Sequence, residues 1–166
     1  WSPSQGRGER LDINFYRSGK PVCFTLIDES YNANPASINS ALDTLIKIEQ
    51  FEKGKIESIK KTNRRIAVLG DMLELGKDEI REHLKIKNLK ALENIDVIHC
   101  VGLRMAKLFS TLPEEKKGFS TKTADEMCDK IVKKIKNRDI ISVKGSFSMN
   151  MKHIILGLKE LQGRNL

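Results

Sequence analysis

The octapeptide Asp28-Glu29-Ser30-Tyr31-Asn32-Ala33-Asn34-Pro35 separates an apolar run that ends at Ile27 from a helical pattern that opens near Ser37. This order predicts a strand, a polar loop and a helix. Asn34 is a good N-cap, and Pro35 suits the first helical turn, where its missing N–H has no intrahelical partner. The loop therefore presents polar side chains and free N–H groups at the carboxyl end of a strand. In an open α/β sheet, ligands such as phosphate bind at that position.

An ordinary turn would explain most of this composition, because Ser, Asn and Asp are common turn residues. Tyr31 does not fit that explanation, since a tyrosine between polar neighbours serves neither a turn nor a cap. We therefore treat the octapeptide as a candidate binding loop.

Strand and helix patterns alternate on both sides of this loop. Upstream, residues 11–17 alternate apolar and polar side chains, and residues 22–27 are almost all apolar, which predicts a hairpin around Gly19-Lys20-Pro21. The remaining predicted strands are 66–69, 97–101, a weak edge strand at Phe119, and 140–143; the predicted helices are 35 to about 54, 78–92, 105–109, 124–135 and 149–161. This alternation predicts an α/β, Rossmann-like three-layer domain, with a mostly parallel sheet, helices on both faces and the N-terminal hairpin at one edge.

Two more predicted strands also end in polar loops. Residues 70–76, Gly-Asp-Met-Leu-Glu-Leu-Gly, place Asp71 between two glycines, and Lys144-Gly145-Ser146 combines a cation, a flexible backbone and a hydroxyl. Either segment could be a plain loop. His83 follows on a charged helix, where a single histidine is more often a surface residue than a catalyst.

A further candidate precedes the hairpin. Gly6-Arg7-Gly8-Glu9 lets the backbone bend while it presents a guanidinium, the group best suited to bidentate phosphate recognition. A lone Arg between glycines is usually only a loop charge, so this segment alone is weak support.

Composition excludes several classes of protein. A charged fraction of 31% beside 39% hydrophobic residues is typical of a soluble globular protein, and 166 residues suit one domain with a sizeable core. The net charge of +8 suggests nucleic-acid binding, but the basic residues are scattered, and 5% aromatics provide few stacking platforms. We interpret Lys60-Lys61, Lys116-Lys117 and Lys133-Lys134 as solvated surface. No apolar run approaches the ~20 residues of a membrane span and no signal peptide is visible, so cytoplasmic residence is the default expectation.

Cys23, Cys100 and Cys128 are an odd number, and each lies in an apolar pattern without metal-ligand spacing. We expect reduced core thiols rather than disulfides or a zinc site. The chain begins at Trp1 without a methionine, as expected of a piece of a longer protein, and residues 1–9 have the composition of a linker.

Together these stretches resemble one family. The octapeptide is similar to the DDSYNANP signature of the Mur ligases, in the branch that adds D-alanyl-D-alanine to UDP-MurNAc-tripeptide. Residues 70–76 match the GDMLELG segment of the same ligases without a change, residues 6–9 match GRGE, and His83 stands where that family also carries a histidine.

The segment that begins at Lys144 resembles the family's KGSRxxxME, with Met151 on its methionine. Phe147 replaces the arginine and Lys152 the glutamate, so no role of those two side chains can be carried across. We hypothesise that Phe147 packs on the closing helix, against Met151, and that Lys144 provides the positive charge at this strand end.

The resemblance implies the third, C-terminal domain of a three-domain ligase, with residues 1–9 as a linker from a central domain and residues 10–166 as the domain itself. Such an enzyme uses ATP to activate a carboxylate as an acyl phosphate, which an amine then attacks. The family's central domain supplies the P-loop and the Mg²⁺ ligands, and no G-x-x-x-x-G-K-[ST] occurs here. We expect this chain to hold no metal and no complete catalytic set, to be inactive alone, and to close over ATP and D-Ala-D-Ala.

The resemblance also implies roles for single residues. Arg7 would meet the ATP phosphates, and the residues that would border the ribose and phosphates are Glu29, Tyr31, Asn32 and Asn34. The residues that would face the amino-acid substrate, or lie near it, are Lys144, Ser146, Asp71 and His83.

Two other interpretations remain open. One is a free-standing α/β module that binds a nucleotide or a protein partner, and the other is a nucleic-acid-binding module, for which salt-dependent binding to random oligonucleotides would be diagnostic. A dinucleotide site of the Rossmann kind is disfavoured, because no G-x-G-x-x-G follows a strand.

Overall fold

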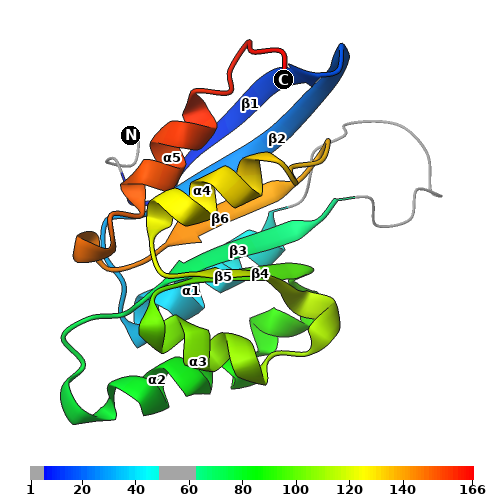
Figure 1. Ribbon diagram of the computed structural model, residues 1–166. Helices are drawn as coiled ribbons and strands as arrows, with labels where there is room; N and C mark the ends of the chain where they lie inside the picture. The colour runs from blue at the N-terminus through cyan, green and yellow to red at the C-terminus, as the bar shows by residue number, and fades with distance from the viewer. Residues whose placement is uncertain (1–5, 49–62) are drawn as a thin grey trace.

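A computed structural model describes residues 6–48 and 63–166 of the chain. Its centre is a six-stranded sheet with the order β1-β2-β6-β3-β4-β5. The strands are β1 (Glu9–Arg17), β2 (Lys20–Glu29), β3 (Arg65–Gly70), β4 (Val97–Val101), β5 (Lys117–Thr121) and β6 (Ile140–Lys144). β1 and β2 pair antiparallel and every other pairing is parallel, which confirms the predicted α/β class and the hairpin at one edge (Figure 1).

The hairpin turn lies earlier than the sequence suggested. Ser18 and Gly19 both adopt positive φ, at 50° and 74°, so two residues make the turn, and Lys20 and Pro21 already belong to β2. A two-residue turn of this hand matches the twist of the strands that it joins. β1 begins at Glu9, which pairs with Asp28, so the sheet starts within the segment expected to be linker.

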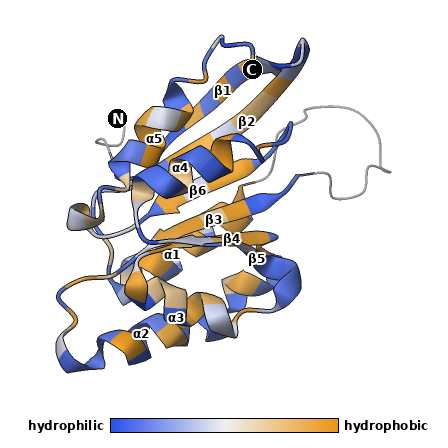
Figure 2. Cartoon of the chain, in the orientation of Figure 1, coloured by the Kyte–Doolittle hydropathy of each residue, from blue (hydrophilic) through white to orange (hydrophobic). Residues whose placement is uncertain are grey.

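Helices cover both faces of the sheet, as predicted. They are α1 (Pro35–Lys47), α2 (Glu79–Lys85), α3 (Leu103–Thr111), α4 (Ala124–Val132) and α5 (Lys152–Lys159). α4 and α5 pack on one face and α1 and α3 on the other, where α2 lies against α3 (Figure 1). Each interface has its own buried cluster, one including Phe15, Phe24, Met127 and Ile155, the other Ile38, Leu42, Ile98 and Met105. Figure 2 shows the apolar strands between helices whose outer surfaces are polar.

The start of α1 confirms the predicted cap. The Asn34 side chain accepts a hydrogen bond from Ser37 N–H at 2.8 Å, and Ser37 Oγ accepts one from Asn34 N–H at 3.0 Å. Such a reciprocal capping box satisfies two backbone donors at the helix start, directly before Pro35. The predicted helix end near Gly54 and the pair Lys60-Lys61 lie outside the described residues.

The helix predicted over 78–92 is wrong in its second half. α2 ends at Lys85 and is followed by the short 3₁₀ segments Ile86–Asn88 and Lys90–Asn94. Leu89 breaks the helix with extended backbone, at φ −70° and ψ 128°. This break lets the apolar residues on both sides of it reach the core, since Ile86 and Leu92 are both buried.

The prediction for the cysteines is correct only in part. Cys100 is fully buried and Cys128 is half-buried, whereas Cys23 is exposed. The side chains of β2 are buried without interruption only from Phe24 to Asp28, so the thiol of Cys23, one residue earlier, remains outside the core. Within the described residues, no helix is long and apolar enough to cross a membrane.

Candidate functional site

Three loops meet at the carboxyl ends of the central parallel strands. They comprise residues 29–34 after β2, residues 70–76 after β3 and residues 144–151 after β6. Because β6 lies between β2 and β3, its loop contacts both of the others, on the left of Figure 1. In open α/β sheets ligands bind at this edge.

Lys144 fixes the loop after β2. Its ammonium group donates to the carbonyl oxygen of Asn32 at 2.6 Å and lies 3.4 Å from that of Glu29 and 3.8 Å from the Glu29 carboxylate. The residue is only 5% exposed. Burial lowers the pKa of Lys144, and Glu29 partly opposes that effect. The lysine therefore ties the chain between Glu29 and Asn32 to the end of β6.

Ser146 joins the other two loops. Its hydroxyl accepts a hydrogen bond from Leu73 N–H at 2.8 Å, and its own N–H donates to the carbonyl oxygen of Asp71 at 3.1 Å. The hydroxyl also lies 3.5 Å from the carbonyl oxygen of Ala33. A single buried serine thus contacts the loops after both β2 and β3.

Two glycines allow these loops to close over Met151, whose side chain is fully buried. A Cβ at Gly145 would lie 2.5 Å from Met151 Cγ, and one at Gly70 would lie 2.7 Å from its Sδ. Contacts that short do not occur between real side chains, so both positions need glycine for close approach.

Asp71 caps a helix from a different loop. Its carboxylate accepts hydrogen bonds from Met105 N–H at 2.7 Å and Arg104 N–H at 3.2 Å, at the start of α3. Arg104 also donates to Glu79 at 2.6 Å, which connects α3 to α2. Asp71 is 2% exposed, so it serves as a buried structural link between its loop and α3.

His83 is fully buried, which rules out the surface position that its helix suggested. One ring nitrogen, Nε2, accepts a hydrogen bond from Met72 N–H at 2.9 Å, so Nδ1 carries the proton and donates to the Glu79 carbonyl oxygen at 2.6 Å. Nε2 therefore holds residues 70–76 against α2, while Nδ1 is engaged within α2 itself.

The glycine-flanked arginine lies against the octapeptide. The guanidinium carbon of Arg7 is 4.3 Å from the centroid of the half-exposed Tyr31 ring, a cation–π contact. Backbone hydrogen bonds join Tyr31 N–H to Gly6 O at 3.1 Å and Gly8 N–H to Asp28 O at 2.7 Å. Gly6 has φ of 76°, and a Cβ there would lie 2.9 Å from Tyr31, so glycine is required for this contact.

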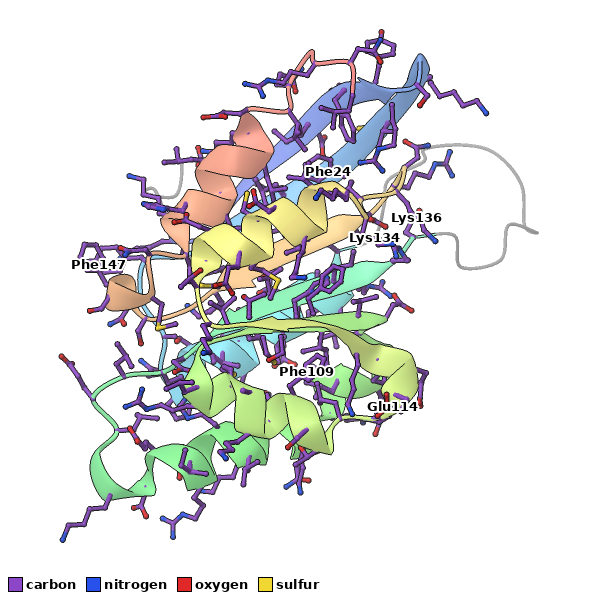
Figure 3. All side chains as sticks on the ribbon, viewed as in Figure 1. Phe24, Phe109, Glu114, Lys134, Lys136 and Phe147 are labelled. Carbon is purple, nitrogen blue, oxygen red and sulfur yellow. The ribbon has the colours of Figure 1, made fainter. Side chains whose placement is uncertain are left out.

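A cleft of about 410 Å³ opens beside Tyr31. It is lined by Gly6, Asp28, Ser30, Tyr31, Phe147, Asn150, Lys152 and His153. Phe147 is 74% exposed and points away from the body of the domain (Figure 3). The hypothesis that it packs on the closing helix is therefore wrong, because residues 147–149 form a 3₁₀ turn that carries the ring outward.

Both acidic groups of the octapeptide are shielded from solvent, Asp28 fully and Glu29 in part. The Asp28 carboxylate accepts hydrogen bonds from both the N–H and the hydroxyl of Ser30, at 3.0 and 2.6 Å. Burial raises the pKa of the Glu29 carboxyl; the Lys144 ammonium opposes that rise and the Asp28 carboxylate adds to it. The Asn32 side chain is exposed, and that of Asn34 is used in the cap of α1.

The family model described as Mur ligase, glutamate ligase domain, matches residues 13–147 of this chain, which is most of its length and includes the loops after β2 and β3 and the first residues of the loop after β6. The chain belongs to the Mur ligase family. The predicted resemblance is thereby confirmed.

Individual Mur ligases are similar to this chain at moderate identity. The UDP-N-acetylmuramoyl-tripeptide–D-alanyl-D-alanine ligase of Haemophilus influenzae is 31% identical over 141 residues, which cover 81% of this chain and 27% of the relative. The enzyme of the same name from Mycobacterium tuberculosis strain CDC 1551 is 33% identical over 120 residues, 69% of this chain and 22% of the relative. The chain thus spans about a quarter of the length of these relatives.

Solved structures of Mur ligases share the fold. A MurF structure from Acinetobacter baumannii has a TM-score of 0.70 at 22% identity and covers 96% of this chain and 31% of the MurF chain. MurF from Thermotoga maritima, solved with ADP, has a TM-score of 0.68 at 15% identity and covers 97% of this chain and 32% of its own.

Within this Mur ligase domain, the residues singled out from sequence fall into two groups, apart from Asn34, whose side chain caps α1. Arg7, Glu29, Tyr31 and Asn32 lie at or near the surface of the octapeptide loop, while the buried residues that hold the loops together are Lys144, Ser146, Asp71 and His83. Sequence reasoning missed Asn150 and His153 in the cleft, for which no motif gives a signal. It also passed over Asp28 and Ser30, although both are part of the octapeptide.

Proposed function

We propose that this chain is the C-terminal domain of an ATP-dependent ligase that adds D-alanyl-D-alanine to UDP-MurNAc-tripeptide, a step of peptidoglycan synthesis. The observation that carries the proposal is that two relatives 31% and 33% identical to it bear this activity in their names. Residues 10–166 would form the domain, and residues 1–9 would connect it to a central domain. The proposal implies a cytoplasmic location, where ATP is available.

The octapeptide loop and its neighbours would contact the nucleotide. The Arg7 guanidinium, which lies over the Tyr31 ring, would meet the phosphates, and Glu29 and Asn32 would border the ribose and phosphates. Asn34 would contribute indirectly, through the start of α1 that it caps. Lys152 and His153 in the adjoining cleft add donors and positive charge that suit an anionic ligand. The residues present therefore fit the phosphate end of a nucleotide.

The four buried residues would support dipeptide binding by fixing the shape of the loops. Lys144 and Ser146 hold the backbone of residues 29–33 and 70–73. Asp71 joins the loop of residues 70–76 to α3, and His83 joins it to α2. A rigid backbone of this kind is what a site needs to orient an amine for attack. We propose that these four residues position the dipeptide-binding loops.

ATP supplies the chemistry by phosphorylating the tripeptide's terminal carboxylate, after which the dipeptide amine attacks the acyl carbon and inorganic phosphate leaves. The described residues contain no group of three or more His, Cys, Asp or Glu that could hold a metal ion. We propose that Mg²⁺ is bound by the central domain, so that this domain contributes closure and binding only.

The test begins with the gene. The reading frame upstream of Trp1 should encode a P-loop domain, and the complete enzyme should convert UDP-MurNAc-tripeptide, D-Ala-D-Ala and ATP to UDP-MurNAc-pentapeptide, ADP and phosphate. The 166-residue chain alone should give no product in the same assay. A complete, folded enzyme that accepts glutamate or another single amino acid but not the dipeptide would overturn the proposal.

A further inference from the structure

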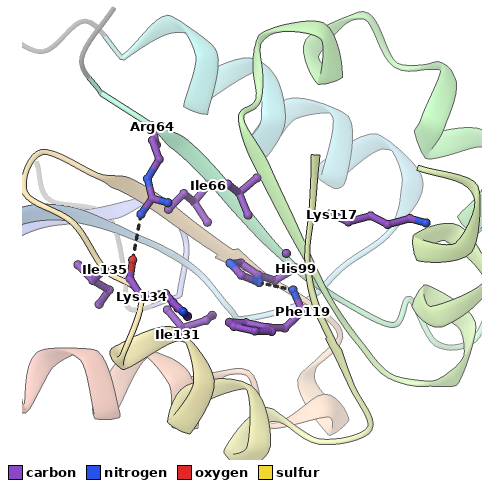
Figure 4. A pocket seen from close by; sticks show the side chains of 10 residues that line it. Arg64, Ile66, His99, Lys117, Phe119, Ile131, Lys134 and Ile135 are labelled. Atoms are coloured by element: carbon purple, nitrogen blue, oxygen red, sulfur yellow. Dashed lines mark hydrogen bonds between the residues drawn. The ribbon is translucent and has the colours of Figure 1, made fainter. Parts of the chain in front are cut away.

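A second cavity, of about 230 Å³, lies at the opposite end of the sheet from the strand-end loops. It opens between α4 and the first residues of β3, β4 and β5 (Figure 4). Its lining residues are Arg64, Ile66, Val97, His99, Lys117, Gly118, Phe119, Ile131, Lys134 and Ile135. The ligase function proposed above makes no use of it.

An imidazole stacked on a phenyl ring forms one wall. The rings of His99 and Phe119 lie 5.3 Å apart between centroids at 23°, and Lys130 Nζ lies 5.4 Å from the centroid of the Phe119 ring. Gly118 makes this stack possible, because a Cβ there would overlap the His99 ring. Apolar side chains complete the wall, among them Ile131 of α4 and Ile135, which follows that helix.

A buried side chain presents a hydrogen-bond donor to the cavity. His99 is 5% exposed, and its Nδ1 accepts a hydrogen bond from Phe119 N–H at 2.8 Å. Burial, together with the charge of Arg64, lowers the pKa of His99 to about 4, so the ring is neutral near pH 7 and its proton is on Nε2. Figure 4 shows this second nitrogen directed toward the space between Arg64 and Ile135. Within residues 6–48 and 63–166 the structure gives Nε2 no acceptor.

Three basic side chains lie at the rim of the cavity, and two of them are paired with carboxylates outside it. None of its ten lining residues is acidic, and three are Arg or Lys. The Arg64 guanidinium is held by Asp139 at 2.6 and 2.9 Å and by the Lys134 carbonyl oxygen at 3.0 Å, and Lys117 is paired with Glu114. The exposed Lys134 ammonium has no ion pair within the part of the chain that the structure describes.

We propose that this cavity binds a small apolar carboxylate of about the size of benzoate, whose oxygens accept a hydrogen bond from His99 Nε2 and face Lys134. The carbon skeleton packs against Phe119, Ile131 and Ile135. The volume is below the ~300 to 1,000 Å³ of sites for drug-sized ligands, so the ligand must be small. A phosphate or sulfate ion would leave the apolar walls without a partner, whereas a neutral hydrocarbon would leave the imidazole N–H unsatisfied.

The experiment titrates the ¹⁵N-labelled 166-residue chain with sodium benzoate and follows amide shifts by NMR. We expect saturable shifts at Gly118 and Phe119. His99→Asn keeps an acceptor for Phe119 N–H and removes the donor at Nε2, so it should weaken binding about tenfold, the equivalent of one hydrogen bond to a charged group. Benzyl alcohol, with the same ring but no charge, should bind more weakly than benzoate.

Lys134→Met provides a second variant at an exposed position that cannot prevent folding, with Lys136→Met as its control, since Lys136 lies nearby but does not line the cavity (Figure 3). We expect severalfold weaker benzoate binding for Lys134→Met and unchanged binding for Lys136→Met. Equal losses in both variants, equal affinity for benzyl alcohol and benzoate, or unsaturable shifts spread over the surface would each overturn the proposal.

Discussion

The ammonium group of Lys144, at the end of β6, donates a hydrogen bond of 2.6 Å to the carbonyl oxygen of Asn32, in the loop that follows β2. Lys144 reaches this position almost without exposure to solvent, at 5%. This buried cation contacts backbone oxygens in the loop of a neighbouring strand. The stability of the domain is therefore coupled to the shape of its candidate binding site.

Lys144→Met should therefore lower the free energy of unfolding, by about 1.5 to 3 kcal/mol, because a hydrogen bond from a charged donor is lost and partly buried carbonyl groups lose that donor. Urea denaturation of both proteins measures the change. Lys152→Met, at an exposed position of α5, is the control and should stay within about 0.5 kcal/mol of the parent. Equal stability of the parent and Lys144→Met would contradict the role given to this lysine.

The carboxylate of Asp71 leads to a second prediction. Asp71→Ala removes both acceptors from the start of α3 and should cost about 1 to 2 kcal/mol, as the loss of a helix cap does. Asp71→Asn keeps an acceptor and should cost less. Asp78→Ala, which removes an exposed carboxylate paired with Arg81 at the surface, should have little effect on thermal unfolding. A loss for Asp78→Ala as large as that for Asp71→Ala would argue against the cap.

Arg7 should matter for nucleotide use and hardly at all for stability. In the complete enzyme, Arg7→Ala should reduce kcat/KM for ATP at least tenfold, because a charge-assisted contact to phosphate is lost, while the melting temperature stays nearly constant. Arg10→Ala removes a similar exposed charge three residues away on β1 and should leave both quantities unchanged. If Arg7→Ala lowered the melting temperature strongly and left kinetics intact, the arginine would be structural.

Because His99 is buried in its neutral form, we expect the domain to lose stability in acid. The pKa of His99 falls from 6.5 to about 4 on folding, so the unfolded chain takes up the proton first as the pH decreases. The stability contributed by neutral His99 is complete above about pH 6.5 and is lost as the pH falls toward 4. Between pH 7 and 4.5 the parent should lose about 2 to 3 kcal/mol more than His99→Asn does. Parallel pH profiles of the two proteins would show that the imidazole is not buried as described.

The three thiols should react in the order of their exposure. Cys23 is exposed, Cys128 is half-buried, and burial raises the pKa of the Cys100 thiol to about 12. A thiol reagent added to the native protein at pH 8 should modify Cys23 first and Cys128 slowly, and should reach Cys100 only after denaturation. Mass spectrometry of digests taken over time gives the order; early modification of Cys100 would contradict the core position.

Local patterns predicted the strand-end loops well. Three features depend only on residues close in sequence: the cap by Asn34, the helix start at Pro35 and the placement of the polar loops at strand ends. Periodicity and capping rules therefore identify them. The side chains within those loops could not be placed in the same way. Whether His83 lies at the surface or in the core depends on residues 70–76 folding back over α2, which no periodic pattern records.

The outward position of Phe147 has a similar explanation. Its apolar character favours burial, but the backbone turn of residues 147–149 and the left-handed Asn150, at φ of 52°, direct the ring away from Met151. The order of strands in the sheet is also a tertiary property, because alternation along the chain predicts parallel strands and leaves open which of them are neighbours.

The insertion of β6 between β2 and β3 has a consequence for how the chain folds as it is synthesised. β2 and β3 have no pairing with each other, so the hairpin and the β3-β4-β5 unit remain two separate, unjoined sheets until residues 140–144 leave the ribosome. During that interval both inner edges expose unpaired N–H and carbonyl groups to other nascent chains. The last of the described strands therefore joins the two parts of the sheet, and pairings this distant in sequence predict a slow folding reaction.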